Sequence, residues 1–298
     1  VLEHIEECGI HSGDSACCWP PFSLSEKIVD QIRDITKKLA LACGIRGLLN
    51  IQYAVRDEHV FVIELNPRAS RTVPFSSKAT GVSLAKYASR IMAGEKISEL
   101  RAQGLLPDEN RTVDYYAVKE AVMPWSRFPG ADSILGPEMK STGEVMGIAR
   151  TFPAAYAKTR EAVENKLPEQ GSVFISVCDR DKRAIAPVAM ALENLGYGIY
   201  TTGGTAKTLR AAGIDCTTVN RISDGHPNVV DLMRDKTVSF IINTPHGHEA
   251  HSDGTKMRAE AVSQGITCVT AMSAATALIQ ALAAARKSEP ETFALQDL

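Results

Sequence analysis

The sequence lacks a long apolar run, a Cys-X-X-Cys pair and an excess of charge of one sign. No apolar run approaches the roughly 20 residues that a membrane-spanning helix needs, and no signal-peptide pattern is visible. The formal net charge of −2 gives no indication of a nucleic-acid partner or a membrane surface. With 44% apolar and 23% charged residues, the composition is typical of a globular protein.

The sequence has few cysteines, and no two of them have the Cys-X-X-Cys spacing. There are 7, an odd number, so we expect reduced thiols in a cytoplasmic protein. The adjacent Cys17 and Cys18 could instead form a redox pair, an alternative that the missing spacing disfavours.

The length of 298 residues suggests two domains at roughly 100–200 residues each. The chain begins at Val1 and opens directly into the charged segment Glu3 to Glu7. We therefore expect a fragment that starts inside a larger domain.

A helix and a hairpin are predicted in the first part of the chain. Ser23 with Glu26 forms a capping-box pattern before apolar residues at helical spacing, and Gly44 is the expected stop. The apolar runs 48–55 and 60–65 predict two strands of a hairpin. Further helical patterns cover residues 83–93 and 96–103.

Residues 105–170 are irregular because six prolines interrupt the periodicity, and the polar stretch Asn165 to Gly171 is the expected domain boundary. Beyond it, strands alternate with helices, which predicts a parallel sheet covered on both faces. The predicted strands are 172–177, 198–201, 216–219, 238–243 and 267–270, and the predicted helices are 185–195, 206–212, 228–233, 258–263 and 274–285.

The strand 60–66 carries the most informative polar residues. Strict alternation places Val60, Val62, Glu64 and Asn66 on one face, and Gln52 lies across from them if the hairpin forms. One carboxylate and two amides are hard oxygen ligands of the kind that magnesium prefers. Alone, Glu64 would more simply end an amphipathic strand and face water.

Two arginines follow this strand directly. Arg68 and Arg71 suit bidentate recognition of phosphate. The whole segment from Glu64 to Arg71, Glu-Leu-Asn-Pro-Arg-Ala-Ser-Arg, resembles the metal-ligand strand of the ATP-grasp ligases. Its continuation over residues 72–81 resembles the large chain of carbamoyl phosphate synthetase, as do residues 3–6, 9–15 and 136–147.

This resemblance covers essentially all of the chain and implies an α/β fold: the C-terminal part of an ATP-grasp domain followed by a doubly wound parallel-sheet methylglyoxal-synthase-like domain. We expect residues 1–110 to belong to the ATP-grasp domain, residues 111–168 to connect, and residues 169–298 to form the allosteric domain. The implied activity is ATP-dependent synthesis of carbamoyl phosphate from bicarbonate and ammonia for arginine and pyrimidine biosynthesis.

The resemblance also implies the roles of individual residues. Gln52, Glu64 and Asn66 would hold divalent Mg or Mn, with Gln52 and Glu64 also contacting ATP, and Arg68 and Arg71 would steady the phosphoryl group or carbamate. Gly9, Ile10, His11 and Ser12 would line the nucleotide. From the residues alone, His11 is better explained as a loop histidine bonded to backbone.

The implied partners are the rest of the large chain and the small glutaminase subunit. Because the upstream half of the ATP-grasp fold is missing, we expect no synthesis of carbamoyl phosphate by this fragment alone.

The C-terminal domain of this family binds nucleotide monophosphates such as UMP and IMP at the carboxyl ends of strands. The matching positions include a Gly-Gly-Thr turn that opens a helix, a ready anion site. They are Ser176, Lys182, Thr202, Gly203, Gly204, Thr205, Arg221, Asn243 and Thr244. Arg221 and Pro245 stand where relatives commonly have Lys and Thr, which leaves the effector open. Glu6, Asp14, Glu120 and Thr270 match positions that bind ornithine.

Three alternatives remain at this point. The chain could be a nucleotide-sensing module only, or a free-standing methylglyoxal synthase. The second is disfavoured by the ligase-like sequence before residue 170 and by the absence of Asp after the glycine in Asp224-Gly225-His226. His246, His248 and His251 could bind zinc, although a loop beside the effector pocket is the simpler interpretation.

Overall fold

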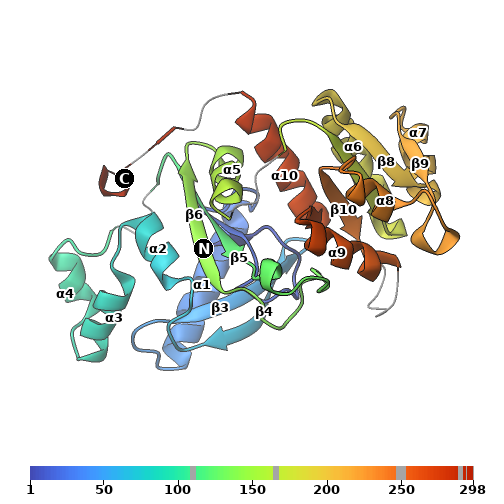
Figure 1. Cartoon of the computed structure of the whole chain (residues 1–298). Coiled ribbons are helices and arrows are strands. Elements are labelled where there is room, and N and C mark those ends of the chain that lie inside the picture. Colours follow the sequence, from blue (N-terminus) through green and yellow to red (C-terminus); the bar gives the residue numbers. More distant parts are fainter. Residues whose placement is uncertain (108–111, 164–167, 246–252, 288–290, 293, 298) are drawn as a thin grey trace.

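The computed structural model describes residues 1–298 except 108–111, 164–167, 246–252, 288–290, 293 and 298. The N-terminal strands and helices lie on one side, and a sheet with helices on both faces lies on the other (Figure 1). Among the described residues, no helix is long and apolar enough to cross a membrane.

The first region contains the predicted hairpin. Strands β3 (Asn50–Arg56) and β4 (His59–Asn66) pair antiparallel, and helix α1 (Glu26–Ala42) packs beside β4. The turn residues Asp57 and Glu58 both have positive φ, which is the backbone that a tight hairpin turn requires. The hairpin prediction is confirmed.

The predicted capping box of α1 is wrong. Ser25, not Ser23, caps the helix and accepts a hydrogen bond from the backbone N–H of Ile28. Ser23 is unavailable because its hydroxyl donates to the carboxylate of Glu3, which also accepts from three backbone N–H groups in this turn.

Three short helices follow the hairpin: α2 (Val73–Thr80), α3 (Leu84–Met92) and α4 (Ile97–Ala102). The last two were predicted, whereas α2 was not. Its Pro74 lies in the first helical turn, where a missing N–H is tolerated.

An antiparallel sheet that the sequence pattern did not predict joins the start of the chain to its middle. Its order is β1 (Glu3–His4), β2 (Cys17–Trp19), β5 (Tyr116–Val122) and β6 (Gly143–Ala149). Helix α5 (Phe152–Ala162) packs closely on β6, where a Cβ on Gly147 would lie 2.3 Å from the carbonyl oxygen of Ala155. Glycine is therefore required at the contact.

Cys17 and Cys18 occupy β2 as free, buried thiols. Burial raises the pKa of Cys17 to about 12 and raises the pKa of Cys18 as well. Because redox chemistry needs the thiolate, the redox-pair alternative has no support here.

The second region is the predicted doubly wound sheet. Five parallel strands have the order β11-β10-β7-β8-β9, and every predicted strand and helix of this region is found. The strands are β7 (Ser172–Val177), β8 (Gly198–Thr202), β9 (Thr217–Val219), β10 (Phe240–Thr244) and β11 (Thr267–Val269). The helices are α6 (Lys182–Asn194), α7 (Gly203–Ala211), α8 (Val229–Arg234), α9 (Asp253–Gln264) and α10 (Met272–Ala285).

Successive strand residues point to opposite faces of the sheet and so contribute to two separate apolar cores. Val173, Ile175 and Ile242 pack with α6, α7 and α10, while Phe174 and Ile241 pack with α8 and α9. Helix α10 also contributes Ala277 and Ala281 to a core shared with α5. This helix therefore packs against both regions.

Candidate functional site

The hairpin brings together the three residues predicted to bind metal. Gln52 and Glu64 are direct partners across the two strands. The amide Nδ2 of Asn66 donates to Oε1 of Glu64 over 2.9 Å, so these two side chains point the same way. Glu64 is exposed, and the other two are half-buried.

The expected alternation along β4 is wrong in one respect. Glu64 pairs with Gln52 but Val62 pairs with Tyr53, so Ile63 is an extra residue in a β-bulge. Since Gln52 and Tyr53 are neighbours that point to opposite faces, Val60 and Val62 do not share the face of Glu64. The bulge lies directly beside the predicted ligands, where it turns the end of the strand.

The oxygen ligands that the hairpin offers suit a hard cation that also keeps water or phosphate ligands. Among the described residues, no group of three or more His, Cys, Asp or Glu could hold a metal ion. The hairpin instead offers one carboxylate and two amide oxygens, which fits magnesium shared with phosphate oxygens and water.

The two arginines after β4 have different surroundings. Arg68 is exposed, and its Nη1 donates to the backbone oxygen of Ala69. Arg71 donates from Nη1 to both the backbone oxygen and the hydroxyl of Ser141, at 3.1 and 2.9 Å. Its Nη2 is buried and has no hydrogen-bond partner among the described residues.

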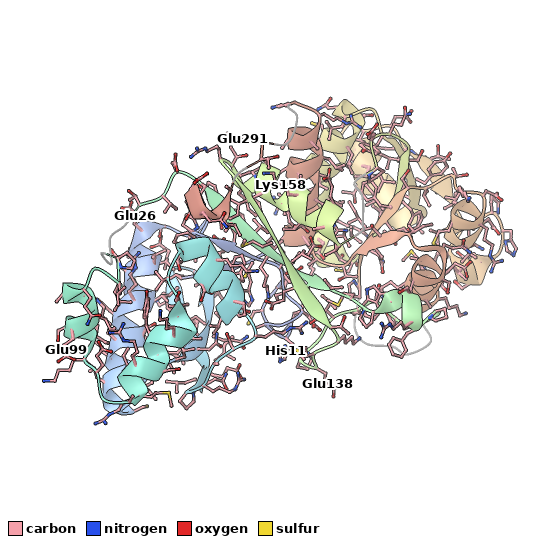
Figure 2. All side chains as sticks on the ribbon, turned by 60° about the vertical axis from the view of Figure 1, so that its left-hand side comes forward. His11, Glu26, Glu99, Glu138, Lys158 and Glu291 are labelled. Atoms are coloured by element: carbon pink, nitrogen blue, oxygen red, sulfur yellow. The ribbon has the colours of Figure 1, made fainter. Side chains whose placement is uncertain are left out.

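The loop expected to line the nucleotide, residues 9–12, is held by backbone contacts. The backbone N–H of His11, a residue labelled in Figure 2, donates to the carbonyl of Gly136 over 2.8 Å. Its ring Nδ1 accepts from the backbone N–H of Gly13, so the simpler interpretation of His11 describes this structure. Gly9 and Ile10 precede it on the same turn.

A buried lysine that the sequence pattern did not reveal fixes this loop. Lys119, fully buried on β5, donates from Nζ to the backbone oxygen of Ser12 and to Glu144, both at 3.1 Å. Removing it would leave the largely buried carboxylate of Glu144 without its cation, although the Thr72 hydroxyl would still donate to it.

Most predicted effector residues meet at the carboxyl ends of β7, β8 and β10. The Ser176 and Thr202 hydroxyls are 3.5 Å apart, and Thr205 Oγ1 accepts from the backbone N–H of Val177. Asn243 Nδ2 donates to the backbone oxygen of Ser176 over 2.9 Å, and the Thr244 hydroxyl accepts from the N–H of Cys178. The structure brings these positions to one edge of the sheet, as expected from its parallel topology, and their role in binding an effector stays a prediction.

The basic residues of this pocket differ in position. A Cβ added to Gly204 would lie 3.4 Å from Nζ of Lys182, so this amine sits at the N-terminus of α7 beside Gly203. Arg221 is exposed at the start of the turn Ile222–Asp224, beyond the edge strand β9. His246, His248 and His251 lie outside the described residues.

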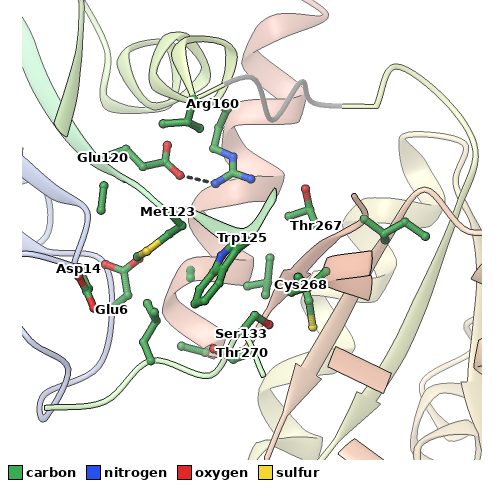
Figure 3. Close-up of a pocket in the computed structure, with 18 of the residues that line it drawn as sticks. Glu6, Asp14, Glu120, Met123, Trp125, Ser133, Arg160, Thr267, Cys268 and Thr270 are labelled. Atoms are coloured by element: carbon green, nitrogen blue, oxygen red, sulfur yellow. Dashed lines mark hydrogen bonds and ion pairs between the residues drawn. The ribbon is translucent and has the colours of Figure 1, made fainter. Parts of the chain in front are cut away.

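The four residues matched to an ornithine site line one cavity of about 270 Å³ between the two regions (Figure 3). Glu6, Asp14 and Glu120 come from the first region and Thr270 from the second. We call it the acidic cavity. Its other polar lining includes Ser133, Tyr156, Arg160 and Thr267.

The acidic cavity shifts the pKa values of titratable groups that line it. Burial and the neighbouring Glu120 raise the pKa of Glu6 to about 8, so its carboxyl is largely protonated at neutral pH. Burial also raises the pKa of the Tyr156 hydroxyl. Burial alone would lower the pKa of Arg160, but the adjacent Glu120 holds it above its ordinary value.

A buried arginine links the effector pocket to the segment beside the acidic cavity. Arg258 on α9 donates to Asp132 from Nε and Nη2, at 2.6 and 2.8 Å, and from Nη1 to Oδ1 of Asn243, at 2.9 Å. Burial alone would raise the pKa of Asp132, but the hydrogen bonds that it accepts from Arg258 hold that pKa below its ordinary value. Neither the pair nor the link to Asn243 was predicted, because an arginine in a helical pattern does not indicate its partner.

Two family models match the chain in the order of its two regions. The model "Carbamoyl-phosphate synthase L chain, ATP binding domain" matches residues 2–100. The model "MGS-like domain" matches residues 184–270. The first match contains the hairpin and the second contains most of the effector pocket.

Curated relatives match nearly the whole chain. It is 47% identical over 297 residues to the carbamoyl phosphate synthase large chain of Acidobacterium capsulatum, covering 99% of this chain and 27% of the relative. It is 47% identical over 301 residues to the large chain of Pseudomonas syringae, covering 100% and 27%. It is 45% identical over 305 residues to the "Carbamoyl phosphate synthase large chain, C-terminal section" of Aquifex aeolicus, covering 98% and 56%. The chain thus spans about a quarter of the length of the full-length relatives.

Proposed function

Because the chain belongs to the carbamoyl phosphate synthase large-chain family, we propose that its hairpin carries the metal-binding edge of an ATP site that phosphorylates carbamate. The convergence of Gln52, Glu64 and Asn66 on the hairpin supports this. A magnesium or manganese ion held there would neutralise phosphate charge. Arg71, with its buried Nη2, would bind a phosphoryl or carbamate oxygen, and Arg68 would approach from solvent.

Synthesis by this region would depend on the rest of such a large chain and on a glutaminase subunit as the ammonia source. The division into residues 1–110, 111–168 and 169–298 belongs to the same proposal, and a cytoplasmic location stays a prediction. The match of residues 2–100 to an ATP-binding domain argues against a free-standing methylglyoxal synthase.

The direct test compares Glu64→Gln with Glu58→Gln inside a complete large chain that contains this region. We expect Glu64→Gln to lower carbamoyl phosphate synthesis from ATP, bicarbonate and ammonia at least about 100-fold, since it removes the one carboxylate ligand. Glu58→Gln, in the turn of the same hairpin, should stay within about twofold. Normal synthesis by Glu64→Gln, or turnover by the 298-residue chain alone, would contradict the proposal.

We further propose that the C-terminal region binds a nucleotide monophosphate. The start of α7 at Gly203, with the Lys182 amine beside it, is a suitable phosphate site. Calorimetry with UMP and with IMP should show that Lys182→Ala weakens binding at least about tenfold. Lys207→Ala, at an exposed position on α7, should not weaken binding, and equal effects of the two changes would refute the site.

A further inference from the structure

The acidic cavity already contains a cation of its own. Arg160 extends from α5 into the cavity toward Glu120 (Figure 3), and only 9% of the residue is exposed. Its Nη1 donates to Oε1 of Glu120, while the Thr159 hydroxyl donates to Oε2 of the same carboxylate over 2.8 Å. Both oxygens of Glu120 are therefore engaged by the protein.

The other two carboxylates have different partners. Asp14 accepts from the backbone N–H groups of Lys140 and Ser141, at 2.8 and 2.9 Å, so its charge is stabilised by the loop it holds. Glu6 accepts from the N–H of Ala16 over 2.6 Å. Glu120 is thus the only one of the three whose described partner is a cationic side chain.

The pairing of Arg160 is incomplete. Its Nε is buried and has no hydrogen-bond partner among the described residues. A buried guanidinium normally satisfies its donors, and one left over is costly. The arrangement matches a group that can exchange its partner when another molecule enters the cavity.

We infer that Arg160 is a specificity-determining residue that competes with a cationic ligand for Glu120. This inference rests on the proposed membership of a large chain and on the expectation, drawn above from the resemblance, that the acidic cavity receives ornithine, an amino acid with a side-chain ammonium group. If Arg160 and the ammonium group were both buried against the carboxylate of Glu120, the two cations would repel each other. The ammonium group therefore binds Glu120 only when Arg160 gives up that contact. Arg160 therefore sets a lower affinity for the cation than Glu120 and Asp14 would give without it.

The test measures ornithine binding by calorimetry with the 298-residue chain and its Arg160→Gln variant. We expect Arg160→Gln to bind ornithine at least about tenfold more tightly, because the competing cation is gone. Arg160→Lys keeps the charge and should bind as weakly as the unchanged chain. Norvaline, which lacks the side-chain ammonium group, should bind to all three proteins with the same affinity.

Two further measurements keep the result interpretable. UMP binding reports whether the C-terminal region stays folded in each variant. Adding Glu120→Gln to Arg160→Gln should abolish the gain in ornithine affinity, since the contested carboxylate is then absent.

Equal or weaker ornithine binding by Arg160→Gln would overturn the inference, including the case in which neither protein binds. If both bind equally well, the cavity remains a cation site and only the role of Arg160 is lost. Failure of the ligase proposal would be seen separately, as normal synthesis by Glu64→Gln.

Discussion

The hairpin and the C-terminal sheet are built in opposite ways. The hairpin has two strands, and Phe61 and Ile63 on β4 are 53% and 52% exposed. The C-terminal sheet has five strands, and its inner residues Phe174 and Ile241 are 1% and 0% exposed. Since an isolated hairpin is marginal in water, the hairpin depends on what packs beside it, whereas the sheet contains its own core.

The difference extends to the two sites. The predicted metal ligands lie on an open edge with exposed Glu64, as expected if other parts of a large chain complete the ATP site. The predicted effector residues lie within one region, and the buried Arg258 ties them to the segment beside the acidic cavity. This contrast agrees with the proposal that an effector binds within the second region, and that synthesis needs more of the ATP site than the hairpin supplies.

The largest expected effect on stability comes from removing the buried side chain of Arg258. Arg258→Ala removes the cation from a pair in which the arginine side chain is 4% exposed, and it also leaves Oδ1 of Asn243 without this donor. We expect a loss of about 3–5 kcal/mol in the free energy of unfolding, because the carboxylate of Asp132, whose side chain is only 25% exposed, is left without its cation. Urea unfolding of the C-terminal region measures it.

The matched control for Arg258 is Arg234→Ala. Arg234 pairs with Glu260 on the same helix α9, but the arginine side chain is 60% exposed, and no measurable loss is expected. Similar urea midpoints for the two variants would mean that Arg258 is not a structural link. UMP affinity should fall for Arg258→Ala alone, because the amide of Asn243 loses a partner that orients it.

A second comparison tests whether the two regions differ in their cores. Leu209 on α7 is fully buried in the core above the sheet, so Leu209→Ala should lower the free energy of unfolding by about 2–5 kcal/mol. Phe61→Ala in the exposed hairpin should cost less than about 1 kcal/mol in this chain, since little apolar surface is lost from contact. A large loss for Phe61→Ala would show that the hairpin face is covered in solution.

The fold could be predicted where contacts are local. The β-strands and α-helices described after residue 170 followed from periodicity, since each has alternating or helical apolar spacing bounded by turns, whereas the short 3-10 helices there were not predicted. The sheet β1-β2-β5-β6 could not, because Cys18 pairs with Val118 far along the chain and two of its strands have only two or three residues. The bulge at Ile63 was also invisible, since it depends on the partner strand.

The sites divide in the same manner. The strand-end rule placed Ser176, Thr202 and Asn243 together because it follows from the parallel topology. It could not place Arg221, which lies beyond the edge strand. Arg160 and Arg258 were missed because each is a single cation in a helical segment, and only the tertiary structure shows which carboxylate it meets.

The smallest effect is expected at the hairpin turn. Lys27 on α1 pairs with Glu58 over 2.9 Å, but their side chains are 65% and 67% exposed. The hydrogen bond from Lys27 lowers the pKa of Glu58, so any stabilisation is present above the ordinary pKa of a glutamate and is lost as the pH falls through the lowered value. Water and salt screen such a pair, and holding two long side chains costs entropy, so Lys27→Ala should leave the urea midpoint unchanged at pH 7. Lys38→Ala, at an exposed position on the same helix, corrects for the change in helix propensity. A clear loss specific to Lys27→Ala would mean that this surface pair, rather than apolar packing, holds the hairpin against α1, and the contrast between the two regions would then be one of bonding and not only of burial.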